Sequence, residues 1–209
     1  MTLRLVDADS WRDLATFVAR AKYFDTGGAA RLVGHGDVLA VYVSPLHGGG
    51  APVVLGLRTY ALVESSDIDV VVDLAALTDR LARPAAEPVL AVPPAPATGV
   101  SWAGVSPPRT GWTPVGSVPA DVLVAAARVG VAEVAAGVPD VAGGPAVARL
   151  RAAVWSRPLE GTDVPSGAAF AADGLGFLGD EPVAVLAAGP WRRLTTPRGH
   201  VLARRPLLS

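Results

Sequence analysis

Three closely spaced aspartates, Asp67, Asp69 and Asp73, are the first group of residues whose types could do chemistry. Carboxylate oxygens are the ligands that a hard cation such as magnesium prefers. These residues also fall at an expected turn and an expected helix start, where aspartate is common because its side chain caps backbone N–H groups. The histidines lie in or beside expected turns and share no ligand spacing: His35, His47 and His200. We therefore favour capping, and expect no metal site and no cofactor.

Residues 174–179 read Gly-Leu-Gly-Phe-Leu-Gly, the G-x-G-x-x-G spacing of dinucleotide-binding loops. Such a loop binds pyrophosphate only where a strand precedes it and a helix follows, because the helix N-terminus must meet the phosphates. Here Asp180, Glu181 and a strand-like run follow, which places two carboxylates where phosphate would bind. The spacing therefore does not predict a nucleotide site.

A second glycine run, His47-Gly48-Gly49-Gly50, follows the strand-like segment 38–43. It resembles the HGGG loop of α/β-hydrolase lipases and esterases, whose backbone N–H groups stabilise an oxyanion. That family also needs a G-x-S-x-G nucleophile turn, which the sequence lacks. We interpret the glycines as the loop of a β-hairpin.

Residues 101–119 are rich in proline, glycine and tryptophan, and they include Trp102, Arg109 and Trp112. Large rigid aromatics beside an arginine suit a small-molecule pocket or an oligomer interface. The same tryptophans could instead cover the core of the protein. Both interpretations stay open at this point.

The C-terminal hairpin is the basic surface candidate, and its residues are Trp191, Arg192, Arg193, Arg198, His200, Arg204 and Arg205. An arginine-bearing hairpin after two helices resembles the wing of a winged-helix DNA-binding domain, whose arginines would contact phosphates. The preceding helices have no basic face, however, and the formal net charge is −1. Nucleic-acid binding is therefore the less favoured interpretation. The alternative is a sheet edge kept polar against aggregation.

The composition excludes several classes of protein. Hydrophobic residues make up 51% of the chain and charged residues 18%, which argues against disorder. The absence of cysteine excludes disulfides, thiolate nucleophiles and zinc sites built on sulfur. Acidic residues near the start argue against a signal peptide, and no long uncharged apolar run predicts a membrane span. We expect a cytoplasmic protein without a membrane segment, and its arginine, alanine and glycine bias is typical of a GC-rich bacterial genome.

The elements that position these candidates centre on residues 119–137, the longest helical pattern in the chain. Nearly every direction around this helix is apolar, so we expect it to be buried on all sides. Gly130 within it suggests close packing against another backbone. A first helix should start at an Asp9 or Ser10 cap and run to about Tyr23.

The remaining segments predict an α+β fold whose sheet is mostly antiparallel, with two strand meanders packed around the 119–137 helix. The first meander comprises strands at 31–33, 38–43 and 53–63, followed by a strand at 68–72. A helix should begin at Leu74 and stop at Arg83-Pro84, and a strand should cover 89–92. Helices at 145–155 and 166–170 precede the second meander, at 183–187, 191–195 and 200–204. We expect one compact domain over 1–209, or two lobes, 1–97 and 98–209.

No catalytic set can be assembled from the sequence, so the leading hypothesis is a non-catalytic binding or protein-interaction module that forms a homo-oligomer. Its partner would be a protein, a small molecule or a second copy. Two features support this hypothesis. One is the aromatic segment, residues 101–119, and the other is a charge asymmetry, since residues 64–87 are acid-rich and residues 189–209 are arginine-rich. The alternatives are a small-molecule enzyme whose residues converge only in space, and nucleic-acid binding through the 191–205 hairpin.

Overall fold

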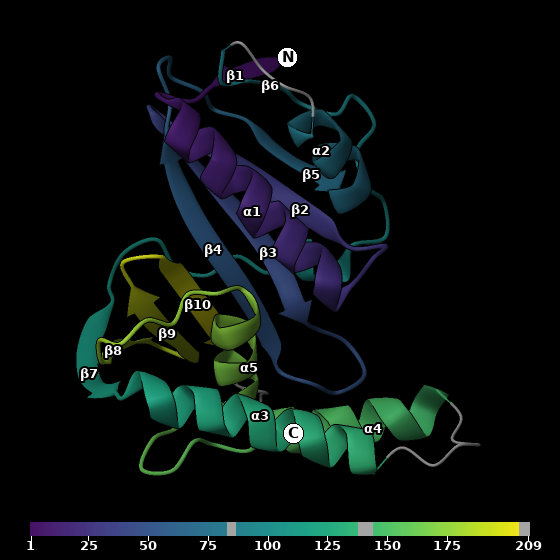
Figure 1. Ribbon diagram of the computed structural model, residues 1–209, viewed down its shortest axis with the longest axis vertical. Coiled ribbons are helices and arrows are strands. Elements are labelled where there is room, and N and C mark those ends of the chain that lie inside the picture. The colour runs from purple at the N-terminus through teal and green to yellow at the C-terminus, as the bar shows by residue number, and fades with distance from the viewer. Residues whose placement is uncertain (83–86, 138–143, 205–209) are drawn as a thin grey trace. The chain divides into compact units, whose positions relative to one another are not determined.

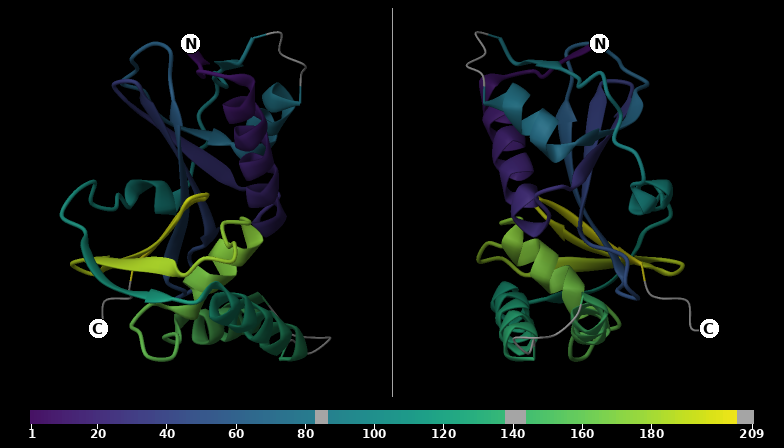
Figure 2. Two further views of the ribbon diagram at one scale, coloured as in Figure 1. Left: turned by 60° about the vertical axis from the view of Figure 1, so that its left-hand side comes forward. Right: turned by 90° about the vertical axis from the view of Figure 1, so that its right-hand side faces the viewer.

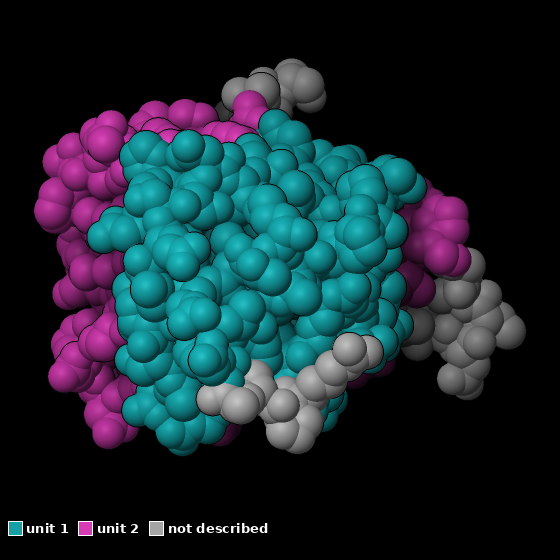
Figure 3. Space-filling model, turned by 90° about the horizontal axis from the view of Figure 1, so that it is seen from above, with its two compact units in different colours: residues 1–44, 57–105 teal, residues 45–56, 106–209 magenta. Residues whose placement is uncertain are grey.

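A computed structural model describes residues 1–82, 87–137 and 144–204. The chain forms two compact units, coloured separately in Figure 3. Unit 1 comprises residues 1–44 and 57–105, and unit 2 comprises residues 45–56 and 106–209. Each unit is described by itself below, and the organisation as one domain stays a prediction.

Unit 1 contains an antiparallel sheet with the strand order β5-β2-β3-β4. Its strands are β2 (Ala29–His35), β3 (Val38–Leu46), β4 (Val53–Ala61) and β5 (Asp69–Asp73). The first meander and the following strand are thereby confirmed. A separate two-stranded sheet pairs β1 (Thr2–Arg4) with β6 (Val89–Ala91). Three residues were too few to predict β1 from the sequence.

Two helices belong to unit 1, α1 (Ala8–Phe24) and α2 (Leu74–Leu81), and they lie side by side (Figure 1). The apolar stripe of α1 is buried, with Leu14 and Val18 fully enclosed. The cap of α1 is Asp7, whose carboxylate accepts a hydrogen bond from Ser10 N at 2.7 Å, so the expected cap was two or three residues late. Asp73 occupies the N-cap position of α2 as expected, but its side chain forms no capping hydrogen bond. The expected stop at Arg83-Pro84 lies outside the described residues. A 3-10 turn, η1 (Ser101–Gly104), ends the unit.

Unit 2 contains the strand order β10-β9-β8-β7, with every neighbouring pair antiparallel. Its strands are β7 (Thr113–Val118), β8 (Val183–Ala188), β9 (Trp191–Thr196) and β10 (Gly199–Arg204). The second meander is confirmed. The sequence did not predict β7, because Pro114 and Gly116 interrupt it, and the pairing is irregular between them. Proline is tolerated at a sheet edge, and β7 is the last strand of this order.

The helices of unit 2 are α3 (Ala120–Ala136), α4 (Gly144–Ser156) and α5 (Ser166–Gly174). Figure 2 shows α3 and α4 running next to each other, with α5 against both. One face of the sheet packs on α5, through residues that include Leu194 and Val201, each 1% exposed. The α+β class with mostly antiparallel sheet is therefore confirmed.

The helix α3 lies where the sequence predicts it, but it is not enclosed on every side. Leu123 and Ala127 on its inner face are 0% and 2% exposed, whereas Val122 and Val129 on its outer face are 44% and 66% exposed. An apolar composition shows that a helix can be buried, but it does not show whether other helices or strands cover each of its faces. Gly130 packs against the ring of Trp155, rather than against another backbone.

The tip of the β3–β4 hairpin belongs to unit 2. Gly48, Gly49 and Gly50 have φ angles of +72°, +59° and +81°, which favour glycine. A Cβ at Gly49 would lie 3.2 Å from the Cβ of Ala148 in α4. The HGGG run is therefore a hairpin loop packed on α4, as its glycines suggested.

Candidate functional site

One face of the unit 2 sheet carries several of the residues that the sequence singled out. Trp191, Arg193 and Thr195 alternate along β9, so they project from the same side of the sheet. The antiparallel register places His200 opposite Thr195, and Leu202 opposite Arg193. We call this side of the sheet the arginine face; it comprises Trp191, Arg193, Thr195, His200, Leu202 and Arg204, of which Trp191 and Leu202 are buried.

Trp112 lies against Arg193 on this face. The Arg193 Cζ is 4.7 Å from the centroid of the Trp112 ring, a cation–π distance. The indole Nε1–H donates to the Pro108 carbonyl at 2.9 Å, which fixes the orientation of the ring. The structure thus unites a residue of the aromatic segment with one of the basic hairpin, two candidates that lie 81 positions apart in the chain.

The charge of Arg193 is uncompensated among the described residues. Its Nε atom is buried and has no hydrogen-bond partner there. Burial lowers the pKa of Arg193 from its ordinary value. The strands β7 to β10 contain no aspartate or glutamate, and no ion pair joins Arg193 to a described carboxylate. A partly buried cation with these surroundings favours an anion as its counterpart.

His200 is the titratable neighbour of Arg193. Burial lowers the pKa of His200, and the positive charge of Arg193 lowers it further. The imidazole is therefore neutral at pH 7. Its Nδ1 lies 3.2 Å from Thr195 Oγ1, and either atom can be the donor. Sequence reasoning missed Thr195, although the period-two alternation in β9 places it beside Arg193.

The other arginines of the hairpin do not extend this surface into one basic patch. Arg192 projects from the opposite side of β9, where Nε and Nη2 donate to the carboxylate of Asp163. Arg198, in the β9–β10 turn, donates from Nη1 to the Leu178 carbonyl at 2.8 Å. Arg204 is partly exposed at the end of the arginine face. Arg205 lies outside the described residues.

The tryptophans of the aromatic segment have separate environments. Trp102 is 4% exposed and belongs to unit 1, whereas Trp112 belongs to unit 2 and is partly exposed. The interpretation as core is therefore right for Trp102. Trp191 is also buried, at 5% exposure, and Arg109 is exposed.

A set of polar groups around Arg31 also holds η1 in unit 1. Arg31 donates from Nη1 to the Ala103 carbonyl at 2.8 Å. Its Nε and Nη2 donate to both oxygens of Asp69, at 2.8 and 2.7 Å. Asp69 therefore has an arginine partner, and Asp73 lies at the N-cap position of α2. Across the residues that the structure describes, no cluster of His, Asp and Glu could hold a metal ion.

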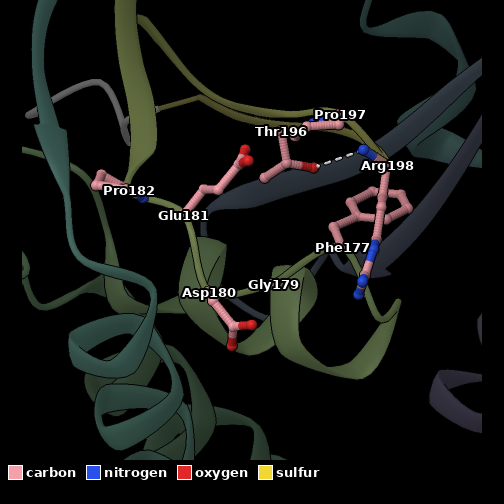
Figure 4. A pocket seen from close by; sticks show the side chains of 8 residues that line it. All are labelled: Phe177, Gly179, Asp180, Glu181, Pro182, Thr196, Pro197 and Arg198. Carbon is pink, nitrogen blue, oxygen red and sulfur yellow. Dashed lines mark hydrogen bonds between the residues drawn. The ribbon is translucent and has the colours of Figure 1, made fainter.

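A pocket of about 380 Å³ lies between the 177–182 segment and the β9–β10 turn (Figure 4). Figure 4 shows Glu181 pointing toward Thr196, while Asp180 points away from it. The G-x-G-x-x-G residues form the end of α5 and the loop after it, and β8 follows. A helix precedes this loop and a strand follows it, the reverse of the dinucleotide-binding order.

The two halves of the chain are similar to two different protein families. Residues 1–104 match a domain of unknown function, DUF8010, and residues 107–208 match a second one, DUF8185. No curated protein and no solved structure matches the chain. The two matched stretches meet where the chain passes from Val105 of unit 1 to Ser106 of unit 2. Within the described ranges, no helix is long and apolar enough to cross a membrane.

Proposed function

We propose that this chain is a non-catalytic binding protein whose arginine face takes an anionic group, a carboxylate or a phosphate. The observation that carries the proposal is the guanidinium of Arg193. It is partly buried on the Trp112 ring and has no carboxylate partner among the described residues. Burying an uncompensated cation costs free energy, and an anionic ligand would offset that cost.

The neighbours of Arg193 suit this role. A guanidinium donates two parallel N–H bonds to a carboxylate or phosphate, so it recognises such groups by shape as well as by charge. The guanidinium carbon lies over the Trp112 ring, which restricts the guanidinium on that side. The neutral His200 and the Thr195 hydroxyl add uncharged donors that can hydrogen-bond a second oxygen.

The enzyme hypothesis has one specific observation in its favour. Because His200 is neutral at pH 7, it could act as a general base. Nucleic-acid binding has less support, because Arg192 and Arg193 project from opposite sides of one strand. We also propose that the protein is cytoplasmic, for which the lack of cysteine is the support.

The proposal is tested by titrating the protein with sodium phosphate, and separately with sodium succinate, at constant ionic strength. The readout is the ¹H–¹⁵N NMR signals of the Arg193 Nε–H and the Trp112 indole N–H. We expect saturable shifts of both signals. Arg193→Gln should weaken binding at least about tenfold, because it removes the charge and the parallel pair of guanidinium N–H donors.

The matched control is Arg198→Gln, which removes the same charge from the exposed β9–β10 turn. It should leave the affinity of both probes within about twofold of the wild type. Equal affinities for the wild type and the Arg193→Gln variant would refute the proposal, and so would equal losses in both variants. Native mass spectrometry of gently purified protein would then identify any co-purifying small molecule.

A further inference from the structure

The outer face of α3 is an exposed apolar stripe. Its residues recur at helical spacing and are all exposed: Val122, Ala125, Val129, Ala132 and Ala136. The opposite face of the helix packs on α4 and α5 (Figures 1 and 2). The stripe therefore lies on an element that unit 2 already holds in place from the other side.

Two charges flank this stripe on one edge. Asp121 and Arg128 are seven residues apart, about 10 Å along the helix, and so lie on the same side of it. Side chains that pair within a helix are three or four residues apart, so these two cannot reach each other. Neither forms an ion pair with a described residue.

We propose that α3 packs antiparallel on α3 of a second copy of this chain, about a two-fold axis near Ala125. A two-fold interface is self-complementary, because each contact occurs twice. Antiparallel packing about this point places Asp121 of each copy beside Arg128 of the other. It also places Val122 of each copy against Val129 of the other, and the small side chain of Ala125 lets the helices approach closely.

A groove beside α3 fits this arrangement. It has a volume of about 480 Å³, and Asp121, Ala125 and Arg128 line it together with Asp180. Two carboxylates therefore flank the place where the second copy's arginine side chain would lie. Because the two charges and the apolar residues Val122, Ala125 and Val129 complement themselves under one two-fold rotation, a second copy fits this surface better than an unrelated chain.

The area of contact sets the expected affinity. The helix has 17 residues and is about 25 Å long, so the stripe is smaller than the ~800 Å² per partner of a standard interface. We therefore expect a dissociation constant between about 1 and 100 µM. This inference is independent of the proposed anionic ligand, which binds elsewhere on unit 2.

The decisive experiment reverses one charge at a time in the full chain. Dimerisation of each variant is measured by sedimentation velocity at protein concentrations from 1 to 200 µM. Asp121→Arg would place two arginines together at both ends of the interface, and Arg128→Asp would place two aspartates together. Each variant alone should dimerise at least about tenfold more weakly than the wild type, because both pairs become repulsive. An equimolar mixture restores both attractive pairs, so it should form a 1:1 heterodimer, which native mass spectrometry resolves by mass.

The apolar stripe is tested by a matched pair of substitutions on the same helix. Val129→Asp lies in the stripe and should abolish dimerisation, whereas Val131→Asp, at a position that is 48% exposed but off the stripe, should not. Circular dichroism and the melting temperature verify that each variant folds. A wild-type monomer at 200 µM would overturn the inference. A dimer that is weakened by none of the three changes Asp121→Arg, Arg128→Asp and Val129→Asp would overturn it as well.

Discussion

The ring of Trp155 occupies the space that any side chain at Gly130 would need. A Cβ built on Gly130 would lie 2.3 Å from Trp155 Cζ3, far inside van der Waals contact. The other side of the indole is stacked on Phe170, with ring centroids 4.4 Å apart. Trp155 is therefore held between α3 and α5, and the absence of a side chain at position 130 is what lets α4 approach α3.

Replacing Gly130 by alanine should destabilise the protein by about 1–3 kcal/mol, because the added methyl group overpacks the Trp155 site. The sign of this change in the free energy of unfolding is informative, since helix propensity alone favours alanine over glycine by about 1 kcal/mol. Urea unfolding measures the change. Gly144→Ala is the control: a Cβ there has no neighbour within 4 Å, so that variant should be neutral or slightly more stable.

Tyr60 should remain un-ionised well above the pH at which free tyrosine titrates. Burial raises the pKa of its phenol, and the charge of Asp13, whose Oδ2 accepts the hydroxyl at 3.0 Å, raises it further. Because the pKa is higher in the folded state, the unfolded chain releases this proton first, and stability should fall as the pH rises above about 10. Absorbance at 295 nm follows the titration, and Tyr60→Phe should remove this component.

Asp69→Asn should destabilise unit 1 by about 1–3 kcal/mol, because it removes the charged partner of a partly buried arginine. Arg31→Gln should have a similar effect, and the double variant should lose much less than the sum, since both changes break one network. Denaturant unfolding provides the three values. Arg12→Gln, in a pair whose side chains are 76% and 82% exposed, should change stability by less than about 0.5 kcal/mol.

His200 should titrate below the ordinary histidine value of 6.5, and Arg193→Gln should raise its midpoint by removing a nearby positive charge. The contribution of His200 to stability is complete above pH ~6.5 and is lost as the pH falls toward its folded pKa, because the unfolded chain binds the proton more readily. NMR of the imidazole C–H signals measures the midpoint. A midpoint unchanged by Arg193→Gln would contradict the proximity of the two residues, and Arg198→Gln should have no effect.

Local pattern predicted much of this fold. The apolar spacing of Leu14 and Val18 identified α1, and the β-branched runs identified β3 and β4. Such signals are local, because a helix or strand must expose one face and bury the other. The cap at Asp7 and the edge strand β7 were missed for local reasons too, since a later aspartate and a proline gave competing signals.

The candidate site could be predicted only in part. Trp112, Arg193 and His200 were each singled out by residue type. Their grouping depends on the contact between Trp112 and Arg193, which lie 81 positions apart in the chain, and periodicity does not encode such a long-range contact. The burial of α3 shows the same limit, because composition identified its apolar faces but not which of them the fold covers.

The β3–β4 hairpin makes the second half of this chain dependent on the first. Residues 45–56 precede the boundary at residue 106 but belong to unit 2, where the Leu46 side chain fills the space above Gly167. A gene fragment that encodes residues 106–209 would thus yield a unit with part of its interior missing. The second half could therefore not be moved or duplicated alone, and a chain with residues 106–209 is expected to keep residues 45–56 in the same polypeptide.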